Sequence, residues 1–216
     1  MTYIDFICNK LKNIKSGTPI YVNRIAEAMA KHFGITKKEA VYAASVAFKR
    51  ILDSGAIPNL RRYQKGIYYL ANKTPFGETK INKEQLILDK YILPDIGYET
   101  GFNALYKMGL TTQIPSVRQI ATNMAKECIR TDKKLGIVIK PPKTEITKEN
   151  KKYLQILDIL DLLDKAPIDE EQPYLIIANY IKEKNLEYSN LLAFADRYYN
   201  KNTIMQLAHT ANIGGL

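Results

Sequence analysis

The sequence predicts an α+β protein made of two parts. Positive charge is concentrated in the first part, because residues 1–73 hold 13 Lys and Arg against 4 Asp and Glu, whereas residues 74–216 hold 19 against 18. Helix-capping patterns alternate along the chain with short runs of β-branched and aromatic residues, as expected when helices are combined with small sheets. We therefore expect a basic domain over 1–73 and a near-neutral α+β domain over 74–216, helical from about residue 147.

Composition sets the broad class of the protein. Of 216 residues, 46% are hydrophobic and 25% are charged, which is typical of globular proteins. No apolar run approaches the roughly 20 residues of a membrane span, and the N-terminus lacks the pattern of a secretory signal, so we expect no membrane partner. Cys8 and Cys128 lie far apart and outside any CxxC pair. We expect no disulfide, no structural zinc and a reducing cytoplasm.

Two helices separated by a short turn are expected in the first domain. Ile20-Tyr21 is a short strand candidate, and Asn23 is positioned to cap a helix that ends at Phe33, before Gly34. Thr36 and Glu39 form a capping box at the start of a second helix, 37–54, which Gly55 ends. The face of this second helix that is expected to pack consists of Ala40, Ala44, Ala47, Phe48 and Ile51.

The far side of helix 37–54 is polar and cationic. At helical spacing, a narrow stripe is formed by Lys38, Tyr42, Ser45 and Lys49, with Lys37 beside it. A lysine-bearing helix face is commonly just solvated, so the stripe alone is weak evidence for nucleic-acid binding.

A basic β-hairpin is expected to follow this helix. Two β-rich segments, 57–60 and 66–70, flank a polar tip that carries Arg61, Arg62 and Lys65. Helix, turn, helix and hairpin predict a winged helix-turn-helix, with helix 37–54 in the major groove of duplex DNA and the hairpin on phosphates. The concentrated charge supports this, because neutralising phosphates releases counterions. We expect a dimer or cooperative pair on inverted half-sites, since one such domain offers only a small interface.

The second domain is expected to begin after Thr74-Pro75-Phe76-Gly77. Its expected helices are 82–93, 98–108, 148–163, 172–182, 189–199 and 203–209, and its expected strands are 117–122, 127–131 and 135–140. Asp158, Asp161 and Asp164 recur along helix 148–163, opposite a leucine face. We expect a solvated acidic face there rather than a metal site. Together with Asp169, Glu170 and Glu171, these aspartates form an acidic run that would also suit a basic partner surface.

Three segments of the second domain carry a family resemblance. They are Gly101-Phe102-Asn103-Ala104-Leu105, Gly109-Leu110-Thr111-Thr112-Gln113-Ile114-Pro115 and Ala121-Thr122-Asn123. Placed after a hairpin that ends Gly66-Ile67-Tyr68-Tyr69, they resemble the AbiEi family of antitoxins from bacterial abortive-infection toxin–antitoxin systems, from about Ile14 to Lys143. The resemblance implies a winged-helix domain that represses its own operon at inverted repeats. It also implies a C-terminal domain that antagonises a nucleotidyltransferase-like toxin encoded beside it.

The motif residues of this resemblance are Gly109, Leu110, Thr111, Thr112, Gln113, Pro115, Thr122 and Asn123. In the segment Gly109 to Pro115 a helix stop precedes an extended Thr-Thr-Gln run and a Pro-ended turn. We favour a bracing role for Thr111, Thr112 and Gln113, by hydrogen bonds to backbone, over direct partner contact.

No catalytic constellation is visible. His32 and His209 are isolated, and His32 falls on the packing face of its helix. The chain lacks a Gly-rich phosphate loop and the Gly-Ser and Asp-x-Asp pair of a nucleotidyltransferase. We therefore expect a non-enzymatic protein without cofactor or metal.

Two alternatives to this interpretation remain. One is a winged-helix regulator whose second domain senses a small ligand, which an apolar pocket with convergent polar groups would favour. The other is an enzyme that its basic part brings to nucleic acid, which requires shifted ionisable groups in a cleft.

Overall fold

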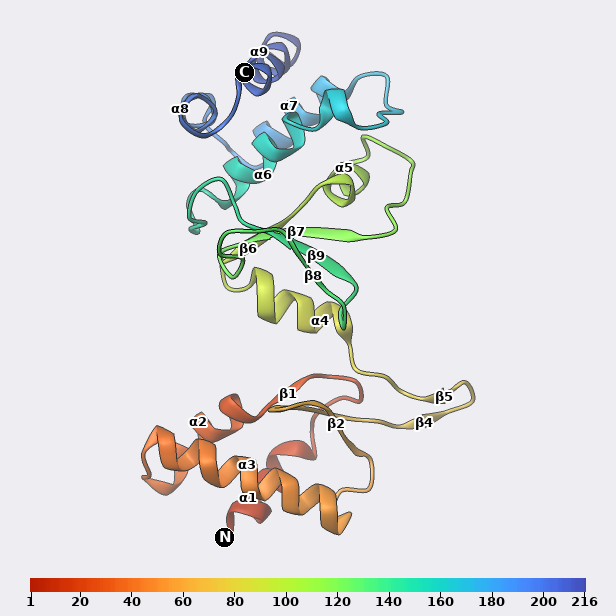
Figure 1. The fold of residues 1–216 in the computed structure, drawn as a ribbon, viewed down its shortest axis with the longest axis vertical. Helices are drawn as coiled ribbons and strands as arrows, with labels where there is room; N and C mark the ends of the chain where they lie inside the picture. The colour runs from red at the N-terminus through yellow and green to blue at the C-terminus, as the bar shows by residue number, and fades with distance from the viewer. The chain divides into compact units, whose positions relative to one another are not determined.

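Helices and short strands alternate along the whole chain, which the computed structural model describes from Met1 to Leu216 (Figure 1). The fold is mixed α+β with nine helices, and the chain divides into two compact units, Met1–Leu86 and Ile87–Leu216. Residues 1–86 hold 15 Lys and Arg against 6 Asp and Glu, so the first unit is the basic one. Every helix is too short or too polar to cross a membrane.

The first unit combines three helices with a small antiparallel sheet in the order β1-β3-β2. Its elements are α1 (Tyr3–Leu11), β1 (Ile20–Tyr21), α2 (Val22–Phe33), α3 (Lys37–Ser54), β2 (Leu60–Gln64), β3 (Ile67–Leu70), β4 (Lys73–Thr74) and β5 (Gly77–Glu78). Residues from all three helices and from the sheet form one core, in which Phe48 of α3 stacks on Tyr68 of β3 with ring centroids 4.7 Å apart.

The expected helix 37–54 is confirmed as α3, including both of its ends. Thr36 Oγ1 accepts from the Glu39 amide at 3.3 Å, and Glu39 Oε2 accepts from the Thr36 amide at 3.0 Å. Gly55 closes the helix with φ +67°, a conformation that favours glycine. The packing face is also confirmed, because all five of its expected residues are buried.

Three features of this unit differ from expectation. Helix α1, which a Thr2/Asp5 capping box begins, was not predicted. Helix α2 starts at Val22, and Asn23 lies inside it, because the Val22 amide donates to the carbonyl of Gly66 at 3.0 Å and so ties the helix start to the hairpin. His32 is exposed and contacts the Phe6 ring at 4.9 Å between centroids, so it is not a core residue.

The turn of the β2–β3 hairpin is shorter than the sequence suggested, and it consists of residues 65–66. Arg61 and Arg62 lie within β2, opposite Tyr69 and Tyr68, and only Lys65 lies in the turn. The prediction of a tip bearing three cations is therefore wrong. Strand pairing continues up to Gln64, opposite Ile67, with a register shift between Arg62 and Gln64, because Tyr68 and Leu70 bury one side of the ladder in the core that the sheet shares with the helices.

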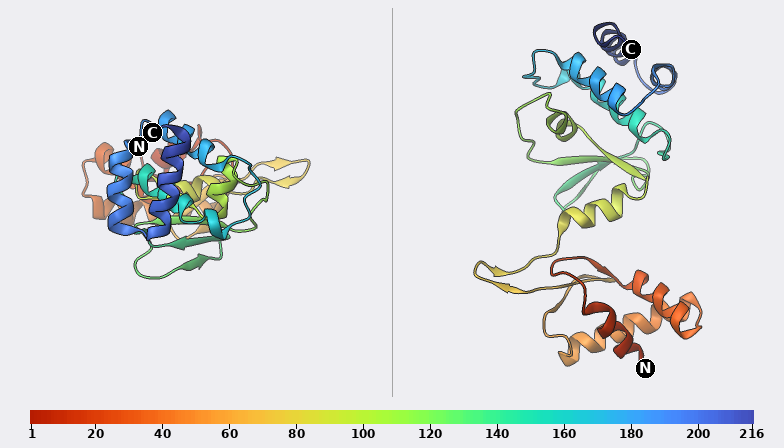
Figure 2. Two further views of the ribbon diagram at one scale, coloured as in Figure 1. Left: turned by 90° about the horizontal axis from the view of Figure 1, so that it is seen from above. Right: turned by 180° about the vertical axis from the view of Figure 1, so that it is seen from behind.

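The second unit contains a four-stranded mixed sheet in the order β6-β7-β9-β8, in which only β7 and β9 run parallel. Its elements, with α4 crossing the division between the units, are α4 (Lys83–Ile87), the π-helix η1 (Leu88–Ile92), β6 (Gly97–Thr100), α5 (Phe102–Met108), β7 (Arg118–Thr122), β8 (Arg130–Asp132), β9 (Ile137–Lys140), α6 (Lys151–Leu160), the 3₁₀ turn η2 (Leu163–Lys165), α7 (Pro173–Glu183), α8 (Tyr188–Tyr198) and α9 (Lys201–Gly214). Helix η1 covers one face of the sheet, α5 and α6 cover the other, and α7 to α9 form a further helical layer on α6 (Figure 2).

The expected helix 98–108 is half wrong. Its first three residues belong to strand β6, and only Phe102–Met108 is helical. Tyr98 and Thr100 are buried on this strand, and Gly101, at φ +69°, separates strand from helix. A side chain at Gly101 would also collide with the Gln119 amide, 2.5 Å from the added carbon, so glycine is required there on two counts. The other expected helices and strands of the second unit are present, with shifted ends. In the first unit the expected β segment 57–60 is wrong, because residues 57–59 form bends and turns and only Leu60 belongs to β2.

Candidate functional site

The solvent face of α3 is the candidate nucleic-acid interface. Lys38, Tyr42, Ser45 and Lys49 are all exposed, and the Tyr42 side chain is 75% exposed. The opposite face of the same helix is fully buried, so the stripe is presented by a rigid element.

Contacts within the unit limit which groups of the stripe are free to bind DNA. Lys37 Nζ lies 2.9 Å from Glu27 Oε1 of α2, so the positive charge of Lys37 is paired with a carboxylate of its own unit. Ser45 Oγ donates to the Val41 carbonyl at 2.8 Å, which leaves its lone pairs to accept a hydrogen bond. Arg50, one turn past Val46, is an exposed cation that the sequence analysis did not single out.

A shallow groove runs beside the stripe. It has a volume of about 550 Å³ and lies between the start of α1, with Thr2 and Tyr3, and the α3 residues Tyr42, Val46 and Arg50. The sequence analysis missed this groove because it did not predict α1. The Thr2/Asp5 capping box, in which Thr2 Oγ1 accepts from the Asp5 amide at 3.1 Å, was the available signal.

Of the three hairpin cations, Arg61 is engaged within its own unit. Its Nη2 and Nε donate to the Glu78 carboxylate at 2.8 and 3.3 Å, and its Nη1 donates to the carbonyls of Pro58 and Leu60. The Arg61 guanidinium holds the pKa of Glu78 below its ordinary value, chiefly through these hydrogen bonds. Arg62 and Lys65 are exposed. Because successive strand residues point to opposite faces, Arg61 and Arg62 face opposite sides of the sheet.

The threonines of the Gly109–Pro115 segment converge on one carboxylate. Asp169 Oδ2 accepts from the Thr112 amide at 2.9 Å, from Thr112 Oγ1 at 2.7 Å and from Thr111 Oγ1 at 3.2 Å. The pKa of Asp169 is lowered, first by the backbone bond from Thr112. Thr111 Oγ1 also accepts from the Gln113 amide at 3.2 Å. The segment is thus fastened to the loop before α7.

Thr122 and Asn123 make a second set of internal contacts. Thr122 Oγ1 donates to the Ile96 carbonyl at 3.0 Å. The Asn123 amide group donates to the Ile146 carbonyl at 2.8 Å and accepts from the Ile146 amide at 2.9 Å. Of the other motif residues, Leu110 is fully buried and Gly109 ends α5 at φ +79°. Pro115 and Ile114 line the small hollow beside Phe102.

The prediction of a solvated acidic face on helix 148–163 is wrong at Asp158, whereas Asp161 is half-buried and Asp164 is exposed. Asp158 is 5% exposed and accepts from Thr100 Oγ1 at 2.6 Å and from Tyr199 OH at 2.8 Å, with Lys140 Nζ at 3.2 Å. The sheet and the C-terminal helices cover this side of α6 as well as its leucine side, which the periodicity of one helix could not indicate.

The other two aspartates fasten the helical layer. Asp161 accepts from Asn200 Nδ2 and Thr203 Oγ1 at 2.8 and 3.0 Å. Asp164 accepts from Asn202 Nδ2 and Gln206 Nε2 at 2.8 and 2.7 Å. All three carboxylates therefore bind α9, its preceding loop or the sheet, and of the three only Asp164 is exposed.

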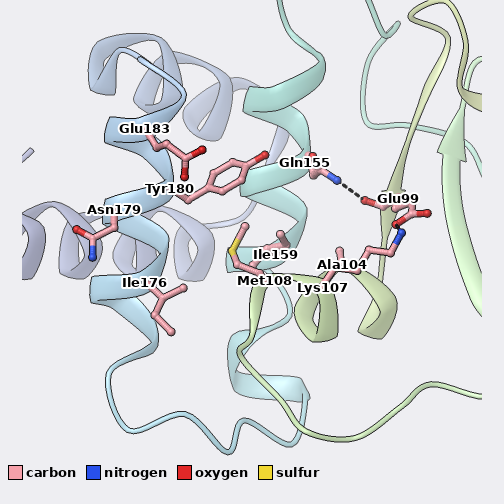
Figure 3. Close-up of a pocket in the computed structure, with 10 residues that line it drawn as sticks. All are labelled: Glu99, Ala104, Lys107, Met108, Gln155, Ile159, Ile176, Asn179, Tyr180 and Glu183. Carbon is pink, nitrogen blue, oxygen red and sulfur yellow. Dashed lines mark hydrogen bonds and ion pairs between the residues drawn. The ribbon is translucent and has the colours of Figure 1, made fainter.

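A cavity of about 370 Å³ lies in the second unit between α5, α6 and α7 (Figure 3). Its apolar lining comes from Ala104, Met108, Ile159, Ile176 and the ring of Tyr180. At one end, Lys107 Nζ lies 2.5 Å from Glu99 Oε2, and Gln155 Nε2 donates to the Glu99 carbonyl at 2.9 Å. Asn179 and Glu183 line the α7 side, so apolar and polar groups share one hollow.

Metal-ligating side chains do not gather in the structure: no group of three or more His, Cys, Asp or Glu is placed to hold an ion. Neither the protein-family models nor the curated proteins compared with this chain match it.

Proposed function

We propose that this protein is a regulator that binds duplex DNA through a winged helix-turn-helix formed by the first unit. The order of its elements supports this, since strand β1, helix α2, a three-residue turn, helix α3 and the antiparallel β2–β3 pair follow one another within one core. Helix α3 would enter the major groove.

The single observation that carries the proposal is the exposed stripe of α3. Four groups able to contact phosphates or base edges stand on one side of a helix whose other side is buried, in a unit with a large excess of cations. Lysines supply affinity that depends on salt, and Tyr42 and Ser45 supply hydrogen bonds to bases.

The test is a gel-shift titration of duplex DNA at several salt concentrations. Replacing both Lys38 and Lys49 by Ala should weaken binding to every sequence and reduce the slope of log K against log salt by about two. Lys31, exposed on α2, provides a matched control whose replacement by Ala should leave the slope unchanged. A slope that is the same in the double variant and the wild type would overturn the placement of α3.

We further propose that the protein represses its own operon and, through residues 87–216, acts as the antitoxin of a nucleotidyltransferase-like toxin without catalysing a reaction. This rests on the AbiEi resemblance of Gly101–Asn123. It is also supported by the near-neutral charge of the second unit, which holds 17 Lys and Arg against 16 Asp and Glu. Co-expression with the adjacent gene in a sensitive host tests it, because growth should recover only when the second unit is present.

A ligand-sensing second unit is the other candidate function, and the cavity between α5, α6 and α7 favours it. The hollow combines apolar walls with polar groups at its ends, which is the usual makeup of a small-molecule site. A thermal-shift screen of metabolites tests this candidate. A genuine ligand should stabilise the wild type and fail to stabilise Ile176→Trp, in which the indole fills the hollow.

A further inference from the structure

The short hairpin β4–β5 presents one apolar side chain entirely to solvent. Phe76 stands at its apex, after Pro75, with a relative exposure of 101%. In Figure 2 the hairpin extends away from the helices and the sheet of the first unit. No other large apolar residue of the chain approaches this exposure, since the next values are 77% for Ile114 and 75% for Tyr42.

Hydrogen bonds within the hairpin shape this apex. Thr74 Oγ1 donates to the Gly77 carbonyl at 2.7 Å and accepts from the Phe76 amide at 3.3 Å. Gly77, at φ +107°, makes the turn. At the base, the Thr79 amide donates to the Asn72 carbonyl at 2.9 Å. The aromatic ring is therefore carried by a defined turn rather than by a loose loop.

The hairpin is also fixed to the sheet that carries α3. Arg61 of β2 holds Glu78 of β5 through two hydrogen bonds, and Asn59 Nδ2 donates to Asn72 Oδ1 at 3.0 Å. Asn59 follows the end of α3 by a short connection. The hairpin thus leaves the unit at the end of the sheet that adjoins the C-terminal end of α3, opposite the Lys65 turn.

The charges around the hairpin select the kind of partner. Lys73 and Lys80 flank it and are exposed, whereas its one acid, Glu78, is neutralised by Arg61. A fully exposed ring between cations suits an anionic partner that also offers a flat apolar contact. The step between two base pairs of duplex DNA has both properties, and apolar wedges that enter such a step from the minor groove kink the duplex.

We infer that Phe76 inserts into a base step of duplex DNA from the minor groove while α3 occupies a neighbouring major groove. The inference rests on the proposed DNA-binding function. In this arrangement the β4–β5 hairpin contacts DNA in addition to α3. Arg61 positions the hairpin through its hydrogen bonds to Glu78.

A bending assay on the full chain tests the inference. The probe is a mixed-sequence duplex of about 30 base pairs with TA and CA steps, labelled with a donor and an acceptor at its two ends, because such steps kink most easily. Wild-type protein should raise energy transfer at saturation. Phe76→Ala should lose most of this rise and bind about tenfold more weakly, and Phe76→Leu, which keeps an apolar wedge, should retain most of it.

Controls separate this inference from the proposed function. Ile129→Ala removes another exposed apolar side chain, in the second unit and away from the α3 stripe, and should bend DNA as the wild type does. If Phe76→Ala bends the probe normally while Lys38→Ala with Lys49→Ala weakens binding, the wedge is wrong and DNA binding stands. If the wild type fails to bind the duplex at low salt, both proposals are overturned. Loss of toxin binding in Phe76→Ala with unchanged DNA bending would instead assign the ring to a protein partner.

Discussion

Asp158 is the residue on which several elements of the second unit depend. Its carboxylate, almost without solvent contact, is hydrogen-bonded by Thr100 of β6 and Tyr199 beyond α8, and it pairs with Lys140 of β9. Asp158→Ala leaves these donors without an acceptor, so we expect it to lower the free energy of unfolding by about 3 kcal/mol. Urea denaturation measures the loss.

Asp196, on the exposed side of α8, is the matched control for this change. Asp196→Ala should alter the free energy of unfolding by less than about 0.5 kcal/mol. Equal losses in the two variants would show that the buried contacts of Asp158 do not stabilise the unit.

The contacts of Asp132 predict that the free energy of unfolding depends on pH. Burial opposes its ionisation, but hydrogen bonds from Lys90, Tyr91 and the Leu135 amide hold its pKa at about 2, below the ordinary 3.8. Because the folded-state pKa is the lower one, the stabilisation is present above about pH 4 and is lost as the pH falls towards 2. Asp132→Asn should cost about 1–2 kcal/mol at pH 7, and the difference from wild type should vanish near pH 2. A pH-independent difference in urea denaturation would contradict this assignment.

At the scale of elements, strand β2 separates two arginines that are adjacent in sequence. Arg61 is held by Glu78 and by two carbonyls, whereas Arg62 is exposed on the other face of the sheet. If the β2–β3 hairpin contacts phosphates, Arg62→Ala should reduce the salt slope of DNA binding by about one. Arg61→Ala should leave the slope almost unchanged and should diminish DNA bending through the loosened β4–β5 hairpin. A larger change of the salt slope in Arg61→Ala than in Arg62→Ala would show that Arg61 exchanges Glu78 for a phosphate when DNA binds.

At the scale of the whole molecule, the two compact units predict a division of labour. Each has its own buried core, so fragments 1–86 and 87–216 should fold separately. We expect 1–86 to shift operator DNA, and 87–216 to restore growth when co-expressed with the adjacent toxin gene. A requirement for the first unit in rescue, with 87–216 well folded by circular dichroism, would argue against this division.

Symmetry gives the second prediction at this scale. A single recognition helix covers few base pairs, and two copies on inverted half-sites roughly double the readout. Footprinting of the protein's own promoter should therefore show two protected half-sites with matching occupancy. Protection of one isolated half-site at saturation would indicate a monomeric complex.

Some features of this protein were determined by the sequence alone, because they depend on neighbours along the chain. The capping box of Thr36 and Glu39 and the left-handed Gly55 fix both ends of α3, and the helical repeat separates its buried face from its polar stripe. The same local chemistry identified α7, α8 and the strands β7 and β9 to within a few residues. The charge difference between the two halves is likewise a property of the sequence.

Only the tertiary structure decided features that join distant segments. Asp158 has the spacing of a solvated residue, yet Thr100 and Tyr199 enclose it, and no periodicity of α6 contains that information. Tyr98–Thr100 became a strand because pairing with β7 outweighed the local helical pattern. Arg61 and Arg62 are adjacent in sequence, but strand geometry directs their side chains to opposite faces of the sheet. Glu78 lies on the side of Arg61 and pairs with it, so Arg62 remains the exposed charge.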